Sequence, residues 1–537
     1  MPIPKTLVVF HYHLLRGGVR SALERSLTCL AQAGWASGRR LKILVGRDAG
    51  VRSFRQCLEG RWDSVQVHRV SALDYRDEPW PDEAAFRGHV KHLAARILDL
   101  AEGETLYWVH NPTLGKNAAV TAAWKAAAQE AQQASLPCRF LYHIHDFPEC
   151  GRIQNLERLR RCWITGGVVD PYPEPSAVAY AVLNGADRAR MERAGVPAGS
   201  LFFLPNLLEL PAPLEPSREA RERIAAALAA YADRQGYTFQ EDRPWWLLPI
   251  RMIRRKNVLE AVLLAAAADP PAQVLITLDA NSAQESPYAE AVKDWVRSRR
   301  YPVVIGFGLE LVGSAFSMAE LMGACHAVLT TSLLEGFGFG FLEGPLLGRS
   351  LLGRNLPDVT CDFQQAGFPS GALYEALPVP VEAAERQRLL AAGRAFAGRY
   401  GGLFPGLAEE SEARFVSALE DLYRREAVDF GLLDLKGQIR VLDRWKEGAL
   451  GKSVGQDLTQ RLQPCRLDER ARSALHELLG PEAHARRLIG AFEALFQDRP
   501  PLSSSGGRAA AGASLTIGLA DLFLDPRYQR PLLGGWQ

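Results

Sequence analysis

The twelve residues from Ser332 to Glu343 combine two features that could bind a charged sugar derivative. The segment reads Ser-Leu-Leu-Glu-Gly-Phe-Gly-Phe-Gly-Phe-Leu-Glu, and its three glycines let the backbone approach a ligand closely. A helix that begins after such a turn presents unpaired N–H groups to an anion. The carboxylates of Glu335 and Glu343 repel phosphate but accept hydrogen bonds from hydroxyl groups. The segment therefore suits a sugar joined to a diphosphate, although a tight βα turn whose glycines serve packing alone is the other interpretation.

A cluster of positive charge, Pro249-Ile-Arg-Met-Ile-Arg-Arg-Lys-Asn257, lies at the end of a predicted strand. The planar fork of arginine and the compact charge of lysine both suit phosphate oxygens. A solvated basic turn is the alternative, and we interpret Arg254 and Arg255 in that way. For Arg251 and Lys256, the position at a strand end, with the glycine-rich segment further along the same predicted sheet, favours a phosphate site.

Paired glycines, Gly17 and Gly18, follow the first predicted strand in the stretch Arg16-Gly-Gly-Val19. At the start of a helix they can offer backbone donors to an anion or to a hydroxyl group. The stretch lacks a full Gly-x-Gly-x-x-Gly fingerprint, which disfavours a nicotinamide dehydrogenase. Glycines that only mark the start of a helix are the second interpretation.

Histidines are concentrated near the ends of three predicted strands in the first half of the chain: His11, His13, His110, His143 and His145. Residues i and i+2 of a strand share a face, so each His-x-His pair can direct two imidazoles the same way. With Asp146 the pattern is compatible with a metal site. Buried hydrogen-bonded side chains and contact with a sugar are the other interpretations, and His145 is the candidate for the sugar.

The first two hundred residues alternate strand-like and helix-like segments, a pattern that predicts a doubly wound parallel sheet. The predicted helices include 19–33 and 83–100. The expected strands are 6–13, 41–46, 65–70, 105–110, 139–145, 179–183 and 201–204.

Four prolines between residues 205 and 216 indicate a linker, and a second alternating series follows it. Its expected helices include 257–268, 289–297 and 318–325, and helices at 382–396 and 410–425 come after it. Its expected strands are 246–251, 273–278, 303–307, 327–331 and 350–353.

We therefore predict an N-terminal Rossmann-like domain at 1–207, a second one at 217–400, and a helical extension at 401–537. The low-complexity stretch 503–514 is expected to form a loop in that extension. Two such domains joined by a linker predict a cleft between the carboxyl ends of their strands.

The composition of the 537-residue chain is that of an ordinary globular protein, with 47% hydrophobic and 23% charged residues. A net charge of +2 gives no bulk attraction to nucleic acid. No signal peptide or membrane span is expected, and eight scattered cysteines without a Cys-x-x-Cys pair indicate reduced thiols. These features predict a cytoplasmic protein. A basic helix face at 158–161 suits either solvent or peripheral contact with anionic lipid.

The segment 332–343 resembles the Glu-x7-Glu motif of retaining GT-B glycosyltransferases of the fourth sequence family, the group 1 type. The usual form is Ser-Leu-x-Glu-Gly-Phe-Gly-x-x-x-Leu-Glu, and this chain meets every fixed position. The spacing from Arg251 to Lys256 matches the family's Gly-Arg-x-x-x-x-Lys pattern, with Ile250 in place of the glycine. A departure follows at Gly353-Arg-Asn-Leu-Pro-Asp358, where the family has a Gly-Gly-Leu-Pro-Glu-like stretch. Arg354 is therefore expected to alter the donor or acceptor pocket.

The resemblance implies that a hexosyl unit moves from a nucleotide-diphosphate sugar to an acceptor, with retention at the anomeric carbon. The absence of any Asp-x-Asp in the sequence agrees with chemistry that needs no metal or other cofactor. The expected catalytic residues are Arg251, Lys256, Glu335 and His145. The expected donor-binding residues are Gly17, Gly18, Phe337, Gly338, Phe339, Gly340 and Glu343, with Glu343 on the nucleotide ribose and Glu335 on the sugar hydroxyls. The acceptor side is assigned to His110, Asn111 and Lys116.

Other classes of protein also fit the sequence. A sugar phosphorylase or a nucleotide-sugar epimerase could use the same fold and the same diphosphate site. A metal-dependent hydrolase built on the His-x-His pairs fits less well. A non-catalytic protein that binds nucleotide sugars would share the binding residues without turnover.

Overall fold

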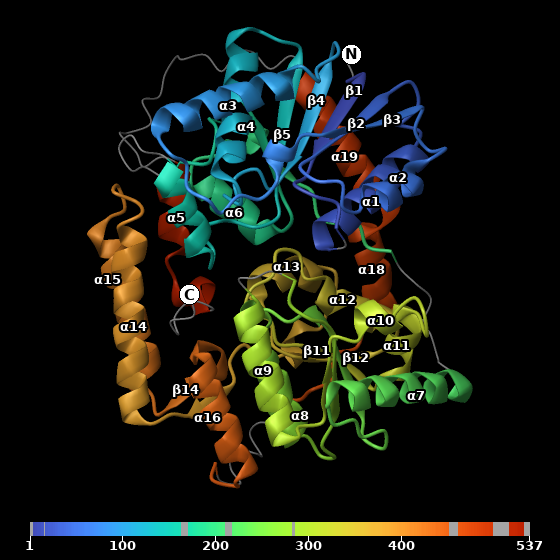
Figure 1. The fold of residues 1–537 in the computed structure, drawn as a ribbon, viewed down its shortest axis with the longest axis vertical. Coiled ribbons are helices and arrows are strands. Elements are labelled where there is room, and N and C mark those ends of the chain that lie inside the picture. Colours follow the sequence, from blue (N-terminus) through green and yellow to red (C-terminus); the bar gives the residue numbers. More distant parts are fainter. Residues whose placement is uncertain are drawn as a thin grey trace. The chain divides into compact units, whose positions relative to one another are not determined.

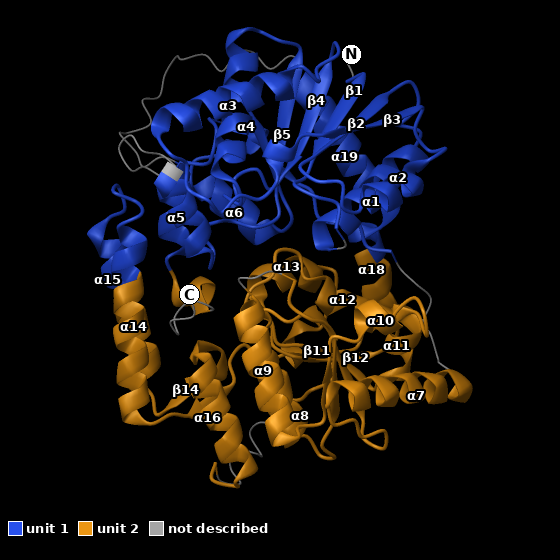
Figure 2. Ribbon diagram, in the orientation of Figure 1, with its two compact units in different colours: residues 1–209, 397–414, 476–524 blue, residues 210–396, 415–475, 525–537 orange. Residues whose placement is uncertain are grey.

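The structure is a computed structural model that describes residues 4–15, 17–162, 170–174, 176–209, 217–281, 285–450, 460–497 and 515–530. The chain divides into two compact units, coloured separately in Figure 2. Unit 1 comprises residues 1–209, 397–414 and 476–524, and unit 2 comprises residues 210–396, 415–475 and 525–537. The tail that was predicted as a separate extension, 401–537, is thus distributed over both units, and the predicted domain limits stay predictions.

Unit 1 is built on a seven-stranded sheet in the order β3-β2-β1-β4-β5-β6-β7, in which all neighbouring strands are parallel (Figure 1). The central strands β1, β4 and β6 are buried along their whole length, because helices cover both faces of a parallel sheet. All seven predicted strands are present: β1 Thr6–Phe10, β2 Arg40–Val45, β3 Ser64–Arg69, β4 Thr105–His110, β5 Cys138–Ile144, β6 Ala179–Val182 and β7 Leu201–Phe203.

The helices of unit 1 come from both ends of the chain. The tail helix α19 packs on α1, where Ser26 Oγ lies 2.8 Å from His484 Nε2 and Phe492 enters the core beside Trp35. The low-complexity stretch 503–514 lies outside the described residues. The helices are α1 Gly18–Gln32, α2 Val51–Leu58, α3 Glu83–Leu98, α4 Ala118–Gln133, α5 Ile153–Cys162, α6 Gly185–Arg193, α19 Pro481–Phe496 and α20 Leu515–Phe523.

Unit 2 contains a five-stranded parallel sheet in the order β10-β9-β8-β11-β12. The five predicted strands are again present: β8 Trp245–Arg251, β9 Gln273–Leu278, β10 Val303–Ile305, β11 Ala327–Thr330 and β12 Ser350–Gly353. Its early helices are α7 Arg218–Gln235, α8 Val258–Ala267, α9 Ser286–Arg299, α10 Gly308–Leu311, α11 Met318–Ala324, α12 Phe339–Leu346 and α13 Pro357–Gln365.

A small antiparallel pair, β13 Pro378–Pro380 and β14 Ala427–Asp429, adds the tail to unit 2. The helix α14 Ala383–Gly401 begins in unit 2 and ends in unit 1, whereas α15 Glu409–Arg424 begins in unit 1 and ends in unit 2. Further described helices of unit 2 are α16 Leu435–Lys446 and α21 Pro526–Gln529, and α18 Glu469–Leu479 begins in unit 2 and ends in unit 1.

In both sheets the strand order reverses beside the first strand of the unit. In unit 1 the first strand, β1, lies between β2 and β4, and in unit 2 the first strand, β8, lies between β9 and β11. Open α/β sheets bind ligands outside the carboxyl ends of their strands, at this reversal point. The segments expected to bind a ligand follow these strands: Gly17 and Gly18 after β1, His110 at the end of β4, the basic turn after β8, and the glycine-rich segment after β11.

A buried ionic cluster in unit 2 has Arg354, the residue after β12, at its centre. Its guanidinium is fully buried and pairs with Glu260 and Asp429, with N–O distances of 2.7 Å to each. Tyr374 donates a hydrogen bond to Glu260 at 2.7 Å, and Arg530 approaches Asp429 at 3.4 Å. Two carboxylates hold this side chain in the interior, so Arg354 does not line a ligand pocket, and its expected effect on one stays a prediction.

Among the described residues, no helix is long and apolar enough to cross a membrane. The seven cysteines whose side chains are described are free thiols, and Cys29, Cys138, Cys325 and Cys465 are buried. Arg158 and Arg160 of the basic face on α5 are bound within unit 1, to Asp77 and to the carbonyl of Gly402. This disfavours the interpretation of α5 as a lipid-binding face.

Replacing Arg354 with Met should destabilise unit 2 by about 3–5 kcal/mol, because Glu260 and Asp429 would keep buried charges without their main partner. The measurement is urea unfolding followed by tryptophan fluorescence. Arg218→Met is the matched control, since Arg218 is 93% exposed and its pair with Glu222 contributes less than about 1 kcal/mol. Equal losses in the two variants would contradict the central role of Arg354.

Candidate active-site residues in the two units

The basic turn and the acidic loop of unit 2 are joined directly. Residues Arg254–Lys256 form a 3₁₀ turn after β8, and Glu335 follows β11, the neighbouring strand. Lys256 Nζ forms an ion pair with Glu335 Oε1, and Arg255 lies 3.4 Å from Glu335 Oε2. Ser332 donates a hydrogen bond of 2.6 Å to the same carboxylate. The two segments singled out from the sequence thus form one site.

Backbone contacts fix this arrangement. The N–H of Leu333 donates to the carbonyl of Arg255 at 2.8 Å, and Thr331 Oγ1 donates to the carbonyl of Lys256 at 2.9 Å. Arg254 donates to the carbonyl of Leu433 at 2.5 Å. The interpretation of Arg254 and Arg255 as solvated residues is therefore wrong, because both are half-buried and bound.

Glu335 stays ionised in this environment. Burial favours the neutral acid, but the charges of Lys256 and Arg255 and the hydrogen bonds from Lys256 and Ser332 outweigh burial. Together they hold the pKa of Glu335 below its usual value. A charged, partly enclosed carboxylate beside two cations can accept hydrogen bonds from hydroxyl groups while the cations remain close to an anion.

Arg251 and Glu343 lie on the same unit as this pair, at the end of β8 and within α12. The Nε atom of Arg251 is buried and has no hydrogen-bond partner among the described residues. Buried donors are normally paired, so an unpaired guanidinium N–H beside the basic turn suits an anionic ligand. Glu343 is half-buried. The roles assigned to Arg251 and Glu343 stay predictions.

The glycines of the motif differ in what the fold requires of them. Gly338 precedes α12 with φ +89°, and a Cβ there would lie 2.5 Å from Val359 Cγ1, so the turn itself needs glycine. Gly340 has no neighbouring atom within 4 Å of a Cβ, so packing does not explain it. Phe337 is buried, and its ring contacts those of Phe339 and Phe363. These aromatic contacts fix the start of α12.

Gly17 and Gly18 of unit 1 are both exposed at the N-terminus of α1. Neither has a positive φ in the left-handed region, and a Cβ at either would meet nothing closer than 3.9 Å. The fold of the described residues therefore does not require glycine at these two positions. Close approach of a ligand to the backbone would explain glycine at these two positions. The preceding residue, Arg16, lies outside the described residues.

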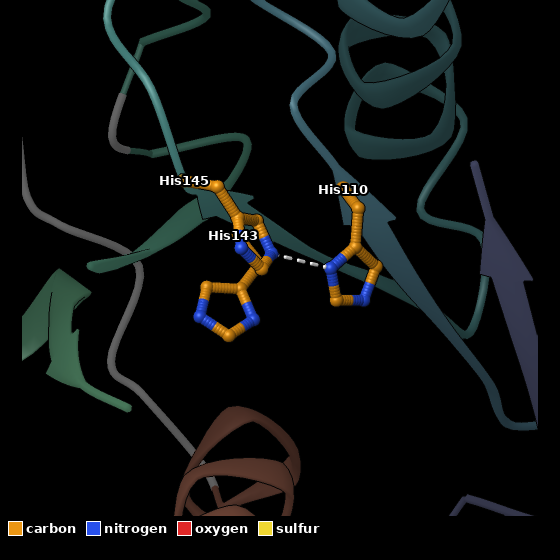
Figure 3. Close-up of side chains that lie close together, drawn as sticks. All are labelled: His110, His143 and His145. Atoms are coloured by element: carbon orange, nitrogen blue, oxygen red, sulfur yellow. Dashed lines mark hydrogen bonds between the residues drawn. The ribbon is translucent and has the colours of Figure 1, made fainter. Parts of the chain in front are cut away.

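Three histidines meet at the ends of β4 and β5 (Figure 3). His110 Nδ1 lies 2.8 Å from His145 Nε2, at hydrogen-bond distance, and the ring centroids of His143 and His145 are 4.5 Å apart. All three side chains are buried. Burial, followed by the neighbouring imidazoles, lowers the pKa of His110 and His143 well below the usual value, and it lowers the pKa of His145 to about 3. These side chains are neutral at physiological pH and offer polarity without charge.

The same three residues form the one group of potential metal ligands found among the described residues, with nitrogens within 4.8 Å of one another. Both ring nitrogens of His143 already have hydrogen-bond partners, however. Its Nε2 lies 3.1 Å from the carbonyl of Leu204, and its Nδ1 accepts from Trp108 Nε1 at 3.3 Å. Asp146, the predicted fourth ligand, pairs with Arg152 at 2.6 Å. A metal would have to displace these bonds, so the geometry favours the hydrogen-bonded interpretation for His143.

Asn111 connects the histidine cluster to its neighbours. It is buried at φ +52°, and its Oδ1 accepts from the N–H groups of His145 at 2.7 Å and Asp146 at 3.2 Å. The left-handed conformation is one that asparagine tolerates. Asn111 thus positions His145. Elsewhere on the predicted acceptor side, the ammonium of Lys116 lies over the ring of Tyr75 at 5.6 Å. The acceptor-side roles of His110, Asn111 and Lys116 stay predictions.

Glu149 was not identified from the sequence as a candidate. It is fully buried four residues after His145, and Tyr172 donates a hydrogen bond of 2.9 Å to its Oε2. Burial raises the pKa of Glu149 to about 7, although hydrogen bonds from its own backbone and from Tyr172 partly oppose this shift. Only its position three residues after His143-Ile-His-Asp146 could have drawn attention to it. No role was assigned to Arg255, which adjoins Lys256, or to Ser332, the first residue of the glycine-rich segment.

Comparison with known proteins supports the fold. No family model matches the chain. A curated relative, the mannosylglucosyl-3-phosphoglycerate synthase of Petrotoga mobilis, is 28% identical over 359 residues, which cover 67% of this chain and 66% of the synthase. The match thus spans just under two thirds of that relative. The crystal structure of HepE from Anabaena, in complex with UDP and glucose, superposes with a TM-score of 0.50 and 12% identity over 91% of this chain and 99% of HepE.

The chain has the GT-B type of fold. The two parallel sheets and the similarity to HepE confirm the predicted fold class and the resemblance to GT-B glycosyltransferases. Membership of the fourth sequence family and the predicted site roles are not settled by these comparisons.

The stability of unit 1 should depend on pH through Glu149. Its pKa is raised from 4.5 in the unfolded chain to about 7, so its favourable contribution is complete below pH 4.5 and is lost as the pH rises to 7. The loss should reach about 3 kcal/mol and then level off. Glu149→Gln should remove this part of the profile, as measured by urea unfolding between pH 4.5 and 8. The exposed control Glu59→Gln should keep it, and parallel profiles for all three proteins would contradict this account.

Proposed function

We propose that the protein is a retaining glycosyltransferase of the fourth sequence family. It moves a hexosyl unit from a nucleotide-diphosphate sugar to an acceptor, without a metal. The observation that carries this proposal is the Lys256–Glu335 ion pair at the reversal point of the unit 2 sheet, directly before the helix that begins at Phe339. Cations and a charged carboxylate beside the N-terminus of a helix match a diphosphate joined to a sugar.

The reaction requires charge stabilisation on the leaving diphosphate. Lys256 and Arg251 supply fixed positive charge from a turn that Thr331 and Leu333 hold against the acidic loop. Groups held in place before the reaction stabilise developing charge without a reorganisation cost. Glu335 accepts hydrogen bonds from sugar hydroxyls, and Glu343 does so from the nucleotide ribose.

Unit 1 contributes uncharged groups. His145, neutral through burial and held by Asn111 and His110, serves the donor sugar as a hydrogen-bonding partner. A neutral imidazole can accept or donate a hydrogen bond at a hydroxyl group without attracting the diphosphate. The commitment of His143 to Trp108 and Leu204 supports chemistry without a metal.

The relatives indicate the class of donor and acceptor. HepE was crystallised with UDP and glucose, which supports a nucleotide sugar as the donor. The curated relative is named for a phosphoglycerate glycoside, which supports an acidic acceptor, and Lys116 of unit 1 suits such a group. A sugar phosphorylase or a nucleotide-sugar epimerase would use the same diphosphate residues, and product analysis with and without acceptor separates these classes. A cytoplasmic location rests on the cysteine pattern and stays part of the proposal.

Nucleotide binding tests the proposal most directly. In a thermal-shift panel of nucleoside diphosphates and nucleotide sugars, one nucleotide should raise the melting temperature, because a ligand that binds the folded state stabilises it. Glu343→Ala should weaken the shift for the nucleotide and raise the Michaelis constant for the donor. An effect of Glu343→Ala on acceptor kinetics alone would contradict the ribose assignment, and the absence of any shift in the wild type would contradict the proposed function.

Loss of the cations should slow transfer. Lys256→Ala and Arg251→Ala should each cost about 3–4 kcal/mol of transition-state stabilisation, the range seen when an electrostatic catalytic donor is removed. The change is measured as kcat/KM for donor turnover, with Arg218→Ala on the exposed face of α7 as the control. Unchanged turnover in Lys256→Ala and Arg251→Ala would remove the diphosphate assignment.

A further inference from the structure

One segment of the tail of unit 2, residues 427–438, contacts residues that flank the Lys256–Glu335 pair. We name this segment the buttress. It comprises β14, the 3₁₀ turn Phe430–Leu432 and the start of α16 (Figure 1). Resemblance to known glycosyltransferases assigns no role to this region. Its contacts nevertheless reach both the basic turn and the acidic loop.

Asn257 is the point where the buttress meets the basic turn. It follows Lys256 directly, is fully buried and has φ +52°. Gln438 Nε2 donates to Asn257 Oδ1 at 2.7 Å, and Asn257 Nδ2 donates to Glu260 Oε2 at 2.7 Å. A left-handed residue reverses the direction of the chain at this position. The side chain that holds Asn257 in this conformation therefore affects the direction in which Lys256 leaves the backbone.

The buttress contacts the rest of the site at two further points. The carbonyl of Leu433 accepts from Arg254, the first residue of the basic turn. On the acidic side, Gly431 lies against Leu333, and a Cβ at Gly431 would be 2.6 Å from Leu333 Cδ2. Leu333 is buried two residues before Glu335. One segment of the tail thus contacts residues that flank both partners of the ion pair.

The buried ionic cluster of Arg354, Glu260 and Asp429 holds the buttress in place. Asp429 accepts from Arg354 with both oxygens, at 2.7 and 3.0 Å, and from the N–H of Leu377 at 2.9 Å. Arg354 in turn holds Glu260, which holds Asn257. A continuous chain of buried hydrogen bonds therefore runs from the tail to the residue beside Lys256.

We propose that the buttress sets the position of Lys256 against Glu335, and that Gln438 and Asp429 are positioning residues for the diphosphate site. This inference rests on the proposed function for its catalytic consequence, whereas the position of the Lys256 side chain can be tested without it. Gln438 is fully buried, so its effect has to pass through its partners, Asn257 and the carbonyl of Phe430.

The test compares two variants, each of which removes a hydrogen bond that involves a residue of α16. Gln438→Met keeps the length of the side chain but loses the donors to Asn257 and to the carbonyl of Phe430. Tyr301→Phe, the control, removes the 3.0 Å bond from Tyr301 to the carbonyl of Leu442, further along α16. Both variants should lower the melting temperature by a few degrees. Only Gln438→Met should lower kcat/KM, on the order of 10- to 100-fold, as expected for a displaced catalytic group.

A second readout does not need turnover. Acetylation of lysine amines by a reactive ester, followed by mass spectrometry, reports how firmly Lys256 is bound to Glu335. Lys256 should be labelled faster in Gln438→Met than in the wild type and in Tyr301→Phe, with the exposed Lys436 as the internal reference. Equal labelling and equal kcat/KM in the two variants would overturn the inference.

The two proposals fail in different ways. If the wild type binds no nucleoside diphosphate, the proposed function fails and the labelling of Lys256 alone decides the inference. If Gln438→Met does not fold, Gly431→Ala replaces it, because the added methyl displaces Leu333 and should likewise release Lys256 from Glu335. Unchanged labelling in Gly431→Ala would then overturn the inference.

Discussion

The ion pair between Lys256 and Glu335 joins segments that are 79 residues apart in the sequence, and the candidate site of unit 2 depends on it. The pair exists because β8 and β11 are neighbours and parallel, so both segments emerge at the same edge of the sheet. Burial makes a charged carboxylate costly unless it is paired. Lys256, Arg255 and Ser332 offset the cost of burial by pairing with Glu335, which therefore remains ionised beside fixed cations.

The same reasoning explains the buried ionic cluster of Arg354, Glu260 and Asp429. Asn257, next to Lys256, has a left-handed backbone conformation that the surrounding contacts must hold. Its contacts lead through Glu260 and Arg354 to Asp429 in the tail. Buried ion pairs contribute little net stability, but they fix one arrangement when each charge has its partners. The cluster is thus better explained by the geometry it imposes than by the stability it adds.

Much of the fold could be predicted because buried parallel strands appear in the sequence as continuous runs of apolar residues. All twelve expected strands of the two main sheets are present, and β4, β9 and β12 have the predicted limits. The local motifs were also predictable, since a strand, a turn and a helix are close in sequence. Partners distant in sequence were not predictable. Arg354 lies 94 residues from Glu260, and α19 reaches the core of unit 1 from the tail, so no local pattern indicated either contact.

The histidines show why residue type and spacing do not define a role. His143 and His145 are two residues apart, yet the first is bound on both ring nitrogens by its own unit, whereas the second has one nitrogen shared with His110. Burial keeps both of them neutral. Unit 1 therefore offers polar groups without charge, and unit 2 offers cations around a carboxylate. Each set suits a different kind of ligand group: neutral imidazoles suit hydroxyl groups, and cations suit an anion.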